Sequence, residues 1–257
     1  MVLPQAISTA PGPIVVEGAF RPLTVSMSMT TFLVEHPQAR FLIDPAMRAD
    51  VHAQVVPLLP RAIRRVVAPN KPVLGLGEAL AQSGRTVTDI DFVLPTHLHW
   101  DHIAGLLELP ALVPVHATVE EHTAAMQSPV TELLLRRQPF DPYVLDGPPV
   151  LTFTSSFDLF GDGAVILVDL AGHTPGSVGI LLALDDGTRV LLAGDAVWHS
   201  RQITLIREKA PFPGNLVDHS RDATFRTIHR LHALPAHVRI IAAHDCAAIS
   251  AYRERER

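Results

Sequence analysis

The sequence predicts an α/β fold in which strands and helices pack in the layers of a sandwich. Short apolar stretches of strand length recur along the 257 residues, and stretches of helical character separate them. Histidines and aspartates stand just beyond the ends of several of the predicted strands. No change of composition marks a boundary, so we expect residues 1–257 to form a single domain around one layered core.

The composition is that of a globular protein and excludes several classes of function. Hydrophobic residues make up 47% of the chain and charged residues 18%. The formal net charge is -5 and no basic cluster is available to neutralise phosphates, so we expect no nucleic-acid partner. The single cysteine, Cys246, excludes an intrachain disulfide and fits a reducing compartment. No signal peptide and no apolar run of about 20 residues is visible, so we expect a soluble, cytoplasmic protein without a membrane partner.

The first half of the chain is predicted to contain an arm, a hairpin and several short elements. Several prolines within residues 1–23 predict an irregular N-terminal arm. The β-prone residues 31–34 and 41–43 flank a turn and predict a hairpin. The other expected elements are a helix at 77–83, strands at 91–94 and 112–115, a helix at 119–127 and a loop-rich stretch at 129–149.

The second half predicts a regular series of strands followed by a long loop. Residues 178–184 and 188–193 flank an Asp-Asp-Gly turn, which is a strong hairpin signal. Residues 198–220 carry prolines and a glycine and are expected to form a functional loop or lid. The other expected elements are strands at 150–154 and 164–169 around a turn at 157–163, a helix at 222–232, a strand at 238–242 and a fraying tail at 253–257.

Four strong metal-ligating side chains lie within six residues, directly after the strand predicted at 91–94. They are His97, His99, Asp101 and His102. Such tight spacing suits a loop that turns its side chains inward, whereas a helix would place ligands four residues apart on one face. The chain holds 14 histidines, and histidine is the commonest protein ligand of metals. The segment therefore predicts a metal site.

Three further candidates share the same kind of position. His173, Asp195 and His244 follow the strands predicted at 164–169, 188–193 and 238–242, and strand ends at one edge of a sheet are where α/β sites assemble. Taken singly, His173 could be a turn residue, Asp195 a helix cap, and His244 a buried, hydrogen-bonded histidine. Together with the first cluster they supply five histidines and two aspartates, enough for two divalent ions. We expect Zn²⁺, with Mn, Fe or Co compatible with the same ligands.

These motifs resemble those of the metallo-β-lactamase superfamily. Residues 96–102 are similar to its metal-binding signature, residues 172–176 to its second histidine motif, residues 193–196 to its bridging aspartate motif, and residues 243–245 to its final histidine. The resemblance implies a four-layer αββα sandwich with the site along one edge of two sheets. It also implies that His97, His99 and His173 hold one metal, that Asp101, His102 and His244 hold the other, that Asp195 bridges them, and that Asp44 supports the ligand loop.

Within the superfamily, the chain most resembles the quorum-quenching N-acyl homoserine lactonases. The likeness rests on residues 32–37, on residues 157–163 leading into the second histidine motif, and on His244-Asp245. Two departures stand out: Trp198 occupies a position where these lactonases often have tyrosine, and Pro45-Ala46 follow Asp44 where a glycine-containing turn is usual. True β-lactamases usually place a cysteine where Asp195 stands.

The resemblance implies hydrolysis of a lactone or related ester of small-molecule size. Solvent held between the two metals would attack the carbonyl carbon, and Asp101 would pass a proton to the leaving group. The loop carrying Trp198, His199 and Phe212 is expected either to shape the substrate pocket or to pack as an ordinary loop. Met27 and Met29 are expected either to line an acyl groove or to be core packing. Related lactonases occur as monomers and as homodimers, so either state is compatible.

Four alternatives stay open. A thioesterase resembling glyoxalase II, or another ester or amide hydrolase of this fold, needs the same ligands, although glyoxalase II adds a C-terminal helical region that binds glutathione. A mononuclear iron dioxygenase resembling persulfide dioxygenase would use fewer ligands. A nuclease resembling the tRNA-processing branch conflicts with the charge. A non-catalytic metal-binding protein would not need all seven candidate ligands.

Overall fold

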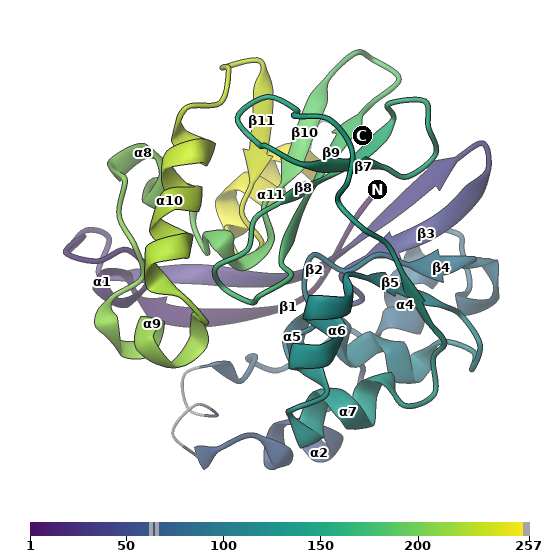
Figure 1. Cartoon of the computed structure of the whole chain (residues 1–257). Coiled ribbons are helices and arrows are strands. Elements are labelled where there is room, and N and C mark those ends of the chain that lie inside the picture. The colour runs from purple at the N-terminus through teal and green to yellow at the C-terminus, as the bar shows by residue number, and fades with distance from the viewer. Residues whose placement is uncertain (62–63, 65–66, 254–257) are drawn as a thin grey trace.

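Two β-sheets form the framework of the computed structural model, which describes residues 1–61, 64 and 67–253 (Figure 1). The first sheet has six strands in the order β1-β2-β3-β4-β5-β6, and the second has five in the order β11-β10-β9-β8-β7. The strands are β1 (Val2–Pro11), β2 (Thr24–His36), β3 (Ala39–Ile43), β4 (Phe92–Val93), β5 (Val115–Ala117), β6 (Phe140–Pro142), β7 (Ser156–Asp158), β8 (Val165–Asp169), β9 (Val178–Ala183), β10 (Arg189–Leu192) and β11 (Val238–Ile241).

Helices cover the outer faces of the two sheets (Figure 1). Within the described part of the chain, none of them is long and apolar enough to cross a membrane. They are α1 (Gly12–Val15), α2 (Val51–Gln54), α4 (Leu76–Gln82), α5 (Trp100–Ile103), α6 (Val119–Ala125), α7 (Pro129–Leu135), α8 (Ser200–Leu205), α9 (Pro211–Val217), α10 (Arg221–His232) and α11 (Cys246–Arg253), with short 3₁₀ turns at Val56–Leu58, Val87–Asp89, Ala104–Glu108 and Gly194–Ala196.

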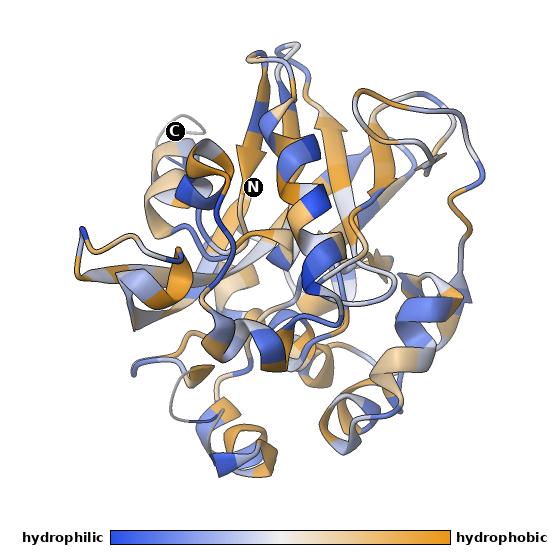
Figure 2. Ribbon diagram, turned by 60° about the vertical axis from the view of Figure 1, so that its left-hand side comes forward, coloured by the Kyte–Doolittle hydropathy of each residue, from blue (hydrophilic) through white to orange (hydrophobic). Residues whose placement is uncertain are grey.

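Many residues of the strands are apolar (Figure 2), and alternate residues of the first sheet enter different hydrophobic cores. Leu33 and Leu42 are fully buried in a core shared with α4, α5 and α7. Their neighbours Phe32 and Phe41 point to the opposite face and pack against the second sheet. This period of two is the geometry of a strand, and it places helices on one side of the sheet and strands on the other.

The second sheet completes the layers in the same way. Ile180 and Leu192 enter the core between the sheets, whereas Leu181 and Leu191 pack with Ile228 of α10 on the outer face. The order of layers is therefore helix, sheet, sheet, helix. The four-layer αββα sandwich implied by the sequence resemblance is confirmed.

Parallel pairing brings the candidate ligands to one edge of the sandwich. Strand β4 pairs parallel with β3 and β5, and β11 pairs parallel with β10. The chain leaves these strands into loops that carry His97 after β4, Asp195 after β10 and His244 after β11. Because carboxyl ends of parallel strands meet at the same edge, the loops converge although they are far apart in sequence.

The expected irregular arm at residues 1–23 is wrong. Residues Val2–Pro11 form β1, which pairs antiparallel with β2 from Val2 opposite Phe32 to Pro11 opposite Thr24. Prolines are tolerated here because β1 is an edge strand and because the register shifts between Pro4 and Ala6, so the missing N–H groups break little of the ladder. Residues Gly12–Val15 then form α1.

Several other elements differ from the prediction, and local geometry explains them. The stretch expected to be loop at 129–149 contains α7, which Pro129 begins at a position where its missing N–H costs nothing, and β6. The strand expected at 150–154 is a turn, with Leu151 at a φ of 56°, and β7 lies just beyond it. The loop or lid expected at 198–220 contains α8 and α9. In the tail expected at 253–257, residues 254–257 lie outside the described residues.

Candidate metal centre

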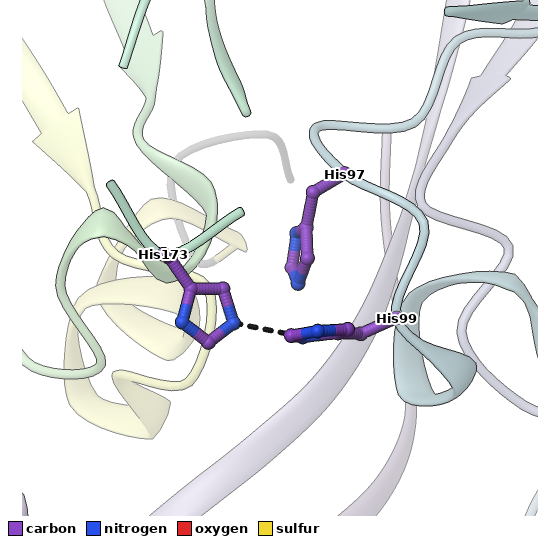
Figure 3. A group of neighbouring side chains, drawn as sticks. All are labelled: His97, His99 and His173. Atoms are coloured by element: carbon purple, nitrogen blue, oxygen red, sulfur yellow. Dashed lines mark hydrogen bonds between the residues drawn. The ribbon is translucent and has the colours of Figure 1, made fainter. Parts of the chain in front are cut away.

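Three histidines from two loops form one half of the site. Figure 3 shows His97 and His99 on the loop after β4 and His173 on the loop between β8 and β9. The Nε2 atom of His173 lies 2.8 Å from Nδ1 of His99, and each of the three side chains offers a ligand atom within 4.8 Å of the others. His97 and His173 are buried and His99 is half-buried. Three convergent imidazoles of this kind can hold a zinc ion.

Asp101, His102 and His244 form the other half. Their ligand atoms also lie within 4.8 Å of one another, and Nε2 of His244 is 3.7 Å from Oδ2 of Asp101. His102 and His244 are buried, whereas Asp101 is half-buried. Two nitrogen donors and one carboxylate oxygen again suit a divalent ion such as Zn²⁺.

The carboxylate of Asp195 lies between the two halves. Its Oδ1 atom is 3.1 Å from Nε2 of His244 and 3.3 Å from Nε2 of His102, and its Oδ2 atom is 3.4 Å from Nε2 of His173. One oxygen therefore faces each half. The Oδ1 atom of Asp195 and the Nε2 atoms of His97 and His102 are buried without a hydrogen-bond partner. Such groups are rarely left unpaired in a folded protein, and a pair of bound cations fits all three.

Hydrogen bonds on the far side of the imidazole rings fix which nitrogen faces the site. The Nδ1–H group of His102 donates to Asp44 at 2.9 Å, that of His173 to Asp218 at 2.8 Å, and that of His244 to the carbonyl of Ser28 at 2.8 Å. Each acceptor holds the proton on Nδ1 and leaves the lone pair of Nε2 directed inward. This arrangement of outer partners is typical of histidines that bind metals.

The pKa shifts differ between the two halves of the site: the pKa values of His97 and His173 are lowered, whereas that of His102 is raised. Burial lowers the pKa of His97 well below its ordinary value and that of His173 to about 4, so both rings are neutral at physiological pH. Burial would raise the pKa of Asp195, but His244 and His102 outweigh it and hold that pKa well below its usual range. Burial likewise works against the charged form of His102, yet the carboxylates of Asp44 and Asp195 raise its pKa.

Asp44 ties the ligand loop to the end of β3. Its Oδ1 atom accepts from the backbone N–H of Thr96 at 2.7 Å, and its Oδ2 atom accepts from the Thr96 hydroxyl and from His102. Asp44 adopts a φ of 50°, a left-handed conformation that aspartate and asparagine tolerate better than most residues. This explains how the chain turns here although Pro45 and Ala46, and no glycine, follow Asp44.

Replacing Asp44 is expected to weaken the half of the site that contains His102. Asp44→Asn keeps the shape and tolerates the same φ, but it loses the charge and one acceptor oxygen. We expect zinc affinity to fall about 10- to 100-fold, the usual effect of losing an outer hydrogen-bond partner. Competition with a chromophoric chelator measures this, and Asp146→Asn, at an exposed aspartate, is the control. Unchanged affinity in Asp44→Asn would contradict the role.

Glu121 joins the two ligand loops and was missed by the sequence analysis. It is only 2% exposed, and its carboxylate accepts from the N–H of Leu98 at 2.7 Å and from the N–H of Gly176 at 3.0 Å. Gly176 is required at this close approach, because a Cβ atom there would lie 2.3 Å from the hydroxyl of Thr118. In the sequence, Glu121 looks like any glutamate in the first turn of a helix, so nothing marks it.

Glu121→Ala is expected to destabilise the fold by about 2 kcal/mol or more, because it leaves the buried N–H of Leu98 and the partly buried N–H of Gly176 without an acceptor. Chemical denaturation of the metal-free protein measures the change. The neighbouring Glu120→Ala is a matched control, since Glu120 is exposed on the same helical turn, and we expect it to stay within about 0.5 kcal/mol of the wild type. Equal effects of the two substitutions would contradict the assignment.

The residues predicted to shape a substrate pocket lie in different surroundings. Trp198 is buried and its Nε1–H donates to Oδ2 of Asp195 at 2.7 Å, so it touches the site. His199 caps α8 and lies 3.3 Å from Asp245, and Phe212 is 52% exposed on α9. Met27 and Met29 are both buried in hydrophobic cores, although Met29 also lines a small cavity beside His244.

A second cavity lies away from these residues. It measures about 950 Å³ and lies between the sheets, where Phe32, Leu182 and Ile241 contribute to its wall. No candidate metal ligand lines it. The small cavity beside His244 is the one that the candidate ligands Asp101 and His102 also line.

The fold is shared with solved hydrolases. A structure of an N-acyl homoserine lactone hydrolase with the product N-hexanoyl-L-homoserine at its catalytic metal centre superimposes with a TM-score of 0.72, at 16% identity, over 100% of this chain and 94% of that one. The dizinc quorum-quenching lactonase AidC superimposes with a TM-score of 0.61, at 14% identity, over 96% of this chain and 87% of that one. At such identities the likeness shows the fold.

Two curated relatives are similar in sequence over part of their length. They are probable metallo-hydrolases of Mycobacterium bovis and Mycobacterium tuberculosis, each 33% identical over 131 residues. The match covers 47% of this chain and 41% of each relative. The chain therefore matches less than half of the length of these relatives. The family model of the metallo-β-lactamase superfamily matches residues 27–244, which hold all seven candidate ligands, and the chain belongs to that superfamily.

Proposed function

We propose that the protein is a binuclear metal-dependent hydrolase that opens a lactone or related ester, of the kind represented by N-acyl homoserine lactones. The observation that carries the proposal is the position of Asp195, whose two carboxylate oxygens face two separate groups of three ligands. A carboxylate placed in this way can bridge ions about 3.5–4 Å apart. We propose zinc as the metal, since AidC, which shares the fold, is a dizinc enzyme.

The proposed division of the ligands follows the two groups. His97, His99 and His173 would hold one ion, Asp101, His102 and His244 the other, and Asp195 would bind both. When bound, two such ions supply nucleophilic solvent at neutral pH and polarise a carbonyl. The seven side chains would set the separation of the ions, and all of them except the half-buried His99 and Asp101 are buried.

Two residues have proposed roles beyond ligation. Asp101 is the half-buried carboxylate of the site, so it is placed to hold a proton and deliver it to a leaving alkoxide. The single N–H donor of Trp198 is already engaged by Asp195, so the indole holds the carboxylate in place and is not available to a substrate carbonyl. This is our proposal for the effect of having tryptophan where related lactonases often have tyrosine.

The lactone assignment is supported by the solved structure that holds N-hexanoyl-L-homoserine at its metal centre. The test is a pH-stat assay of the zinc-loaded protein on N-hexanoyl homoserine lactone, an aryl ester, a glutathione thioester and a β-lactam. We expect the lactone to have the highest kcat/KM, about 10⁴ M⁻¹s⁻¹ or more. A thioester cleaved faster than the lactone would replace the proposal with the thioesterase alternative.

We also propose that the chain forms a single domain, that the protein is cytoplasmic and that its substrate is a small molecule. Gel filtration distinguishes a monomer from a homodimer.

A further inference from the structure

A fully buried lysine lies directly behind the candidate metal centre. Lys209, between α8 and α9, has 0% of its surface exposed. Its ammonium group donates to the backbone carbonyl of Asp195 at 2.9 Å and to Oδ1 of Asp218 at 2.8 Å. It also lies 5.2 Å from the centre of the Trp198 ring, within range of a cation–π interaction. Lys209 therefore touches the main chain of the candidate bridging residue.

The same lysine reaches a second candidate ligand through Asp218. The Oδ1 atom of Asp218 accepts from Lys209 and also from the Nδ1–H group of His173. The backbone next to Asp218 is also hydrogen-bonded to the loop of His173: the N–H of His219 donates to the carbonyl of His173 at 2.9 Å. Arg221 in turn donates to the carbonyl of Lys209 at 2.9 Å. One ammonium group thus connects the loop of Asp195 with the loop of His173.

A charge in this position is expensive to bury. A hydrocarbon side chain of the same length could fill the space without giving up the hydration of an ammonium ion. The ammonium charge is stabilised by the carboxylate of Asp218, the backbone carbonyl of Asp195 and the ring of Trp198. Asp195 is a candidate ligand, Trp198 donates a hydrogen bond to it, and Asp218 accepts one from the candidate ligand His173. The surroundings of the charge point to a task at the metal centre.

We propose that Lys209 is a positioning residue of the metal centre, which holds Asp195 and His173 at the separation that two ions require. The proposal rests on the metal centre described under the proposed function, and it does not depend on which substrate is cleaved. Lys209 touches neither the ions nor the substrate in this role. It acts through the main chain of Asp195 and through the side chain of Asp218.

The test compares Lys209→Met with the wild type and with Lys71→Met, which replaces an exposed lysine. Three quantities are measured: zinc affinity of the metal-free protein by chelator competition, the visible absorption spectrum of the Co²⁺-loaded protein, and the unfolding midpoint of the metal-free protein. We expect Lys209→Met to bind zinc about 10- to 100-fold more weakly and to shift the Co²⁺ bands, and Lys71→Met to match the wild type.

A second variant keeps the proposal testable if Lys209→Met does not fold. Lys209→Met combined with Asp218→Asn removes both charges of the buried pair, a change that is often tolerated. We expect this double variant to fold and still to bind zinc about tenfold or more weakly. The proposal would be overturned if either variant had a lowered unfolding midpoint but kept the zinc affinity and the Co²⁺ spectrum of the wild type. Lys209 would then be a purely structural residue.

The failure of this proposal is distinguishable from the failure of the proposed function. If the wild type binds zinc but cleaves no lactone, the substrate assignment fails and the effect of Lys209→Met on zinc binding still decides the role of the lysine. If the wild type binds no zinc or Co²⁺, both proposals are overturned together.

Discussion

Asp195→Ala is expected to lose metal and activity together. The substitution removes the carboxylate that faces both groups of ligands, and it leaves His102 and His244 without their central partner. We expect the metal content of the purified protein to fall from about two ions per chain to one or fewer. Turnover should fall at least about 10³-fold, which corresponds to about 4 kcal/mol of transition-state stabilisation. Elemental analysis and the lactone assay on the same sample measure both.

The control for this prediction is Asp146→Ala, which removes an exposed aspartate away from the ligands. We expect it to keep the wild-type metal content and rate. If Asp195→Ala kept its turnover, Asp195 would not bridge two metal ions. The mononuclear and non-catalytic alternatives would then be favoured.

Metal removal is the second change for which we expect a large effect. Dialysis against a chelator should abolish hydrolysis, because solvent needs bound ions to react at neutral pH. Added Zn²⁺, Mn²⁺ or Co²⁺ should restore the rate. The fold should survive, since apolar side chains form extensive hydrophobic cores on both sides of each sheet.

Circular dichroism and thermal unfolding of the metal-free protein accompany that assay. We expect an unchanged far-ultraviolet spectrum and a lower unfolding temperature, because a ligand present at about 1,000 times its Kd stabilises the folded state by about 4 kcal/mol. Hydrolysis that persisted after complete metal removal would contradict the proposed mechanism. Loss of the fold itself would instead indicate that the metals are structural.

The candidate ligands that the sequence singled out lie close together in the structure. His97, His99, Asp101 and His102 are close in sequence, and each of the other candidates follows a strand, so motif spacing was enough to bring the set together. The hairpin at 178–193 was also predicted, because its apolar strands and the Asp-Asp-Gly turn between them are local signals.

What the sequence could not predict depends on contacts between distant residues. Strand β1 was taken for an irregular arm, because its prolines hide the fact that it lies at the edge of a sheet. Glu121 and Lys209 are 2% and 0% exposed, yet Glu121 stands in the first turn of an ordinary helix and Lys209 in a short segment between two helices. Their burial arises only when loops from the two sheets meet, so no local pattern distinguishes them from solvated charges.

The number of metal ions per chain tests the central claim most directly. The purified wild type is saturated with Zn²⁺, freed of excess metal by gel filtration, and analysed for zinc and protein in the same fractions. The position of Asp195 between two groups of three ligands predicts about two zinc ions per chain. A value that stays at one under excess zinc, or at none, would contradict the binuclear centre.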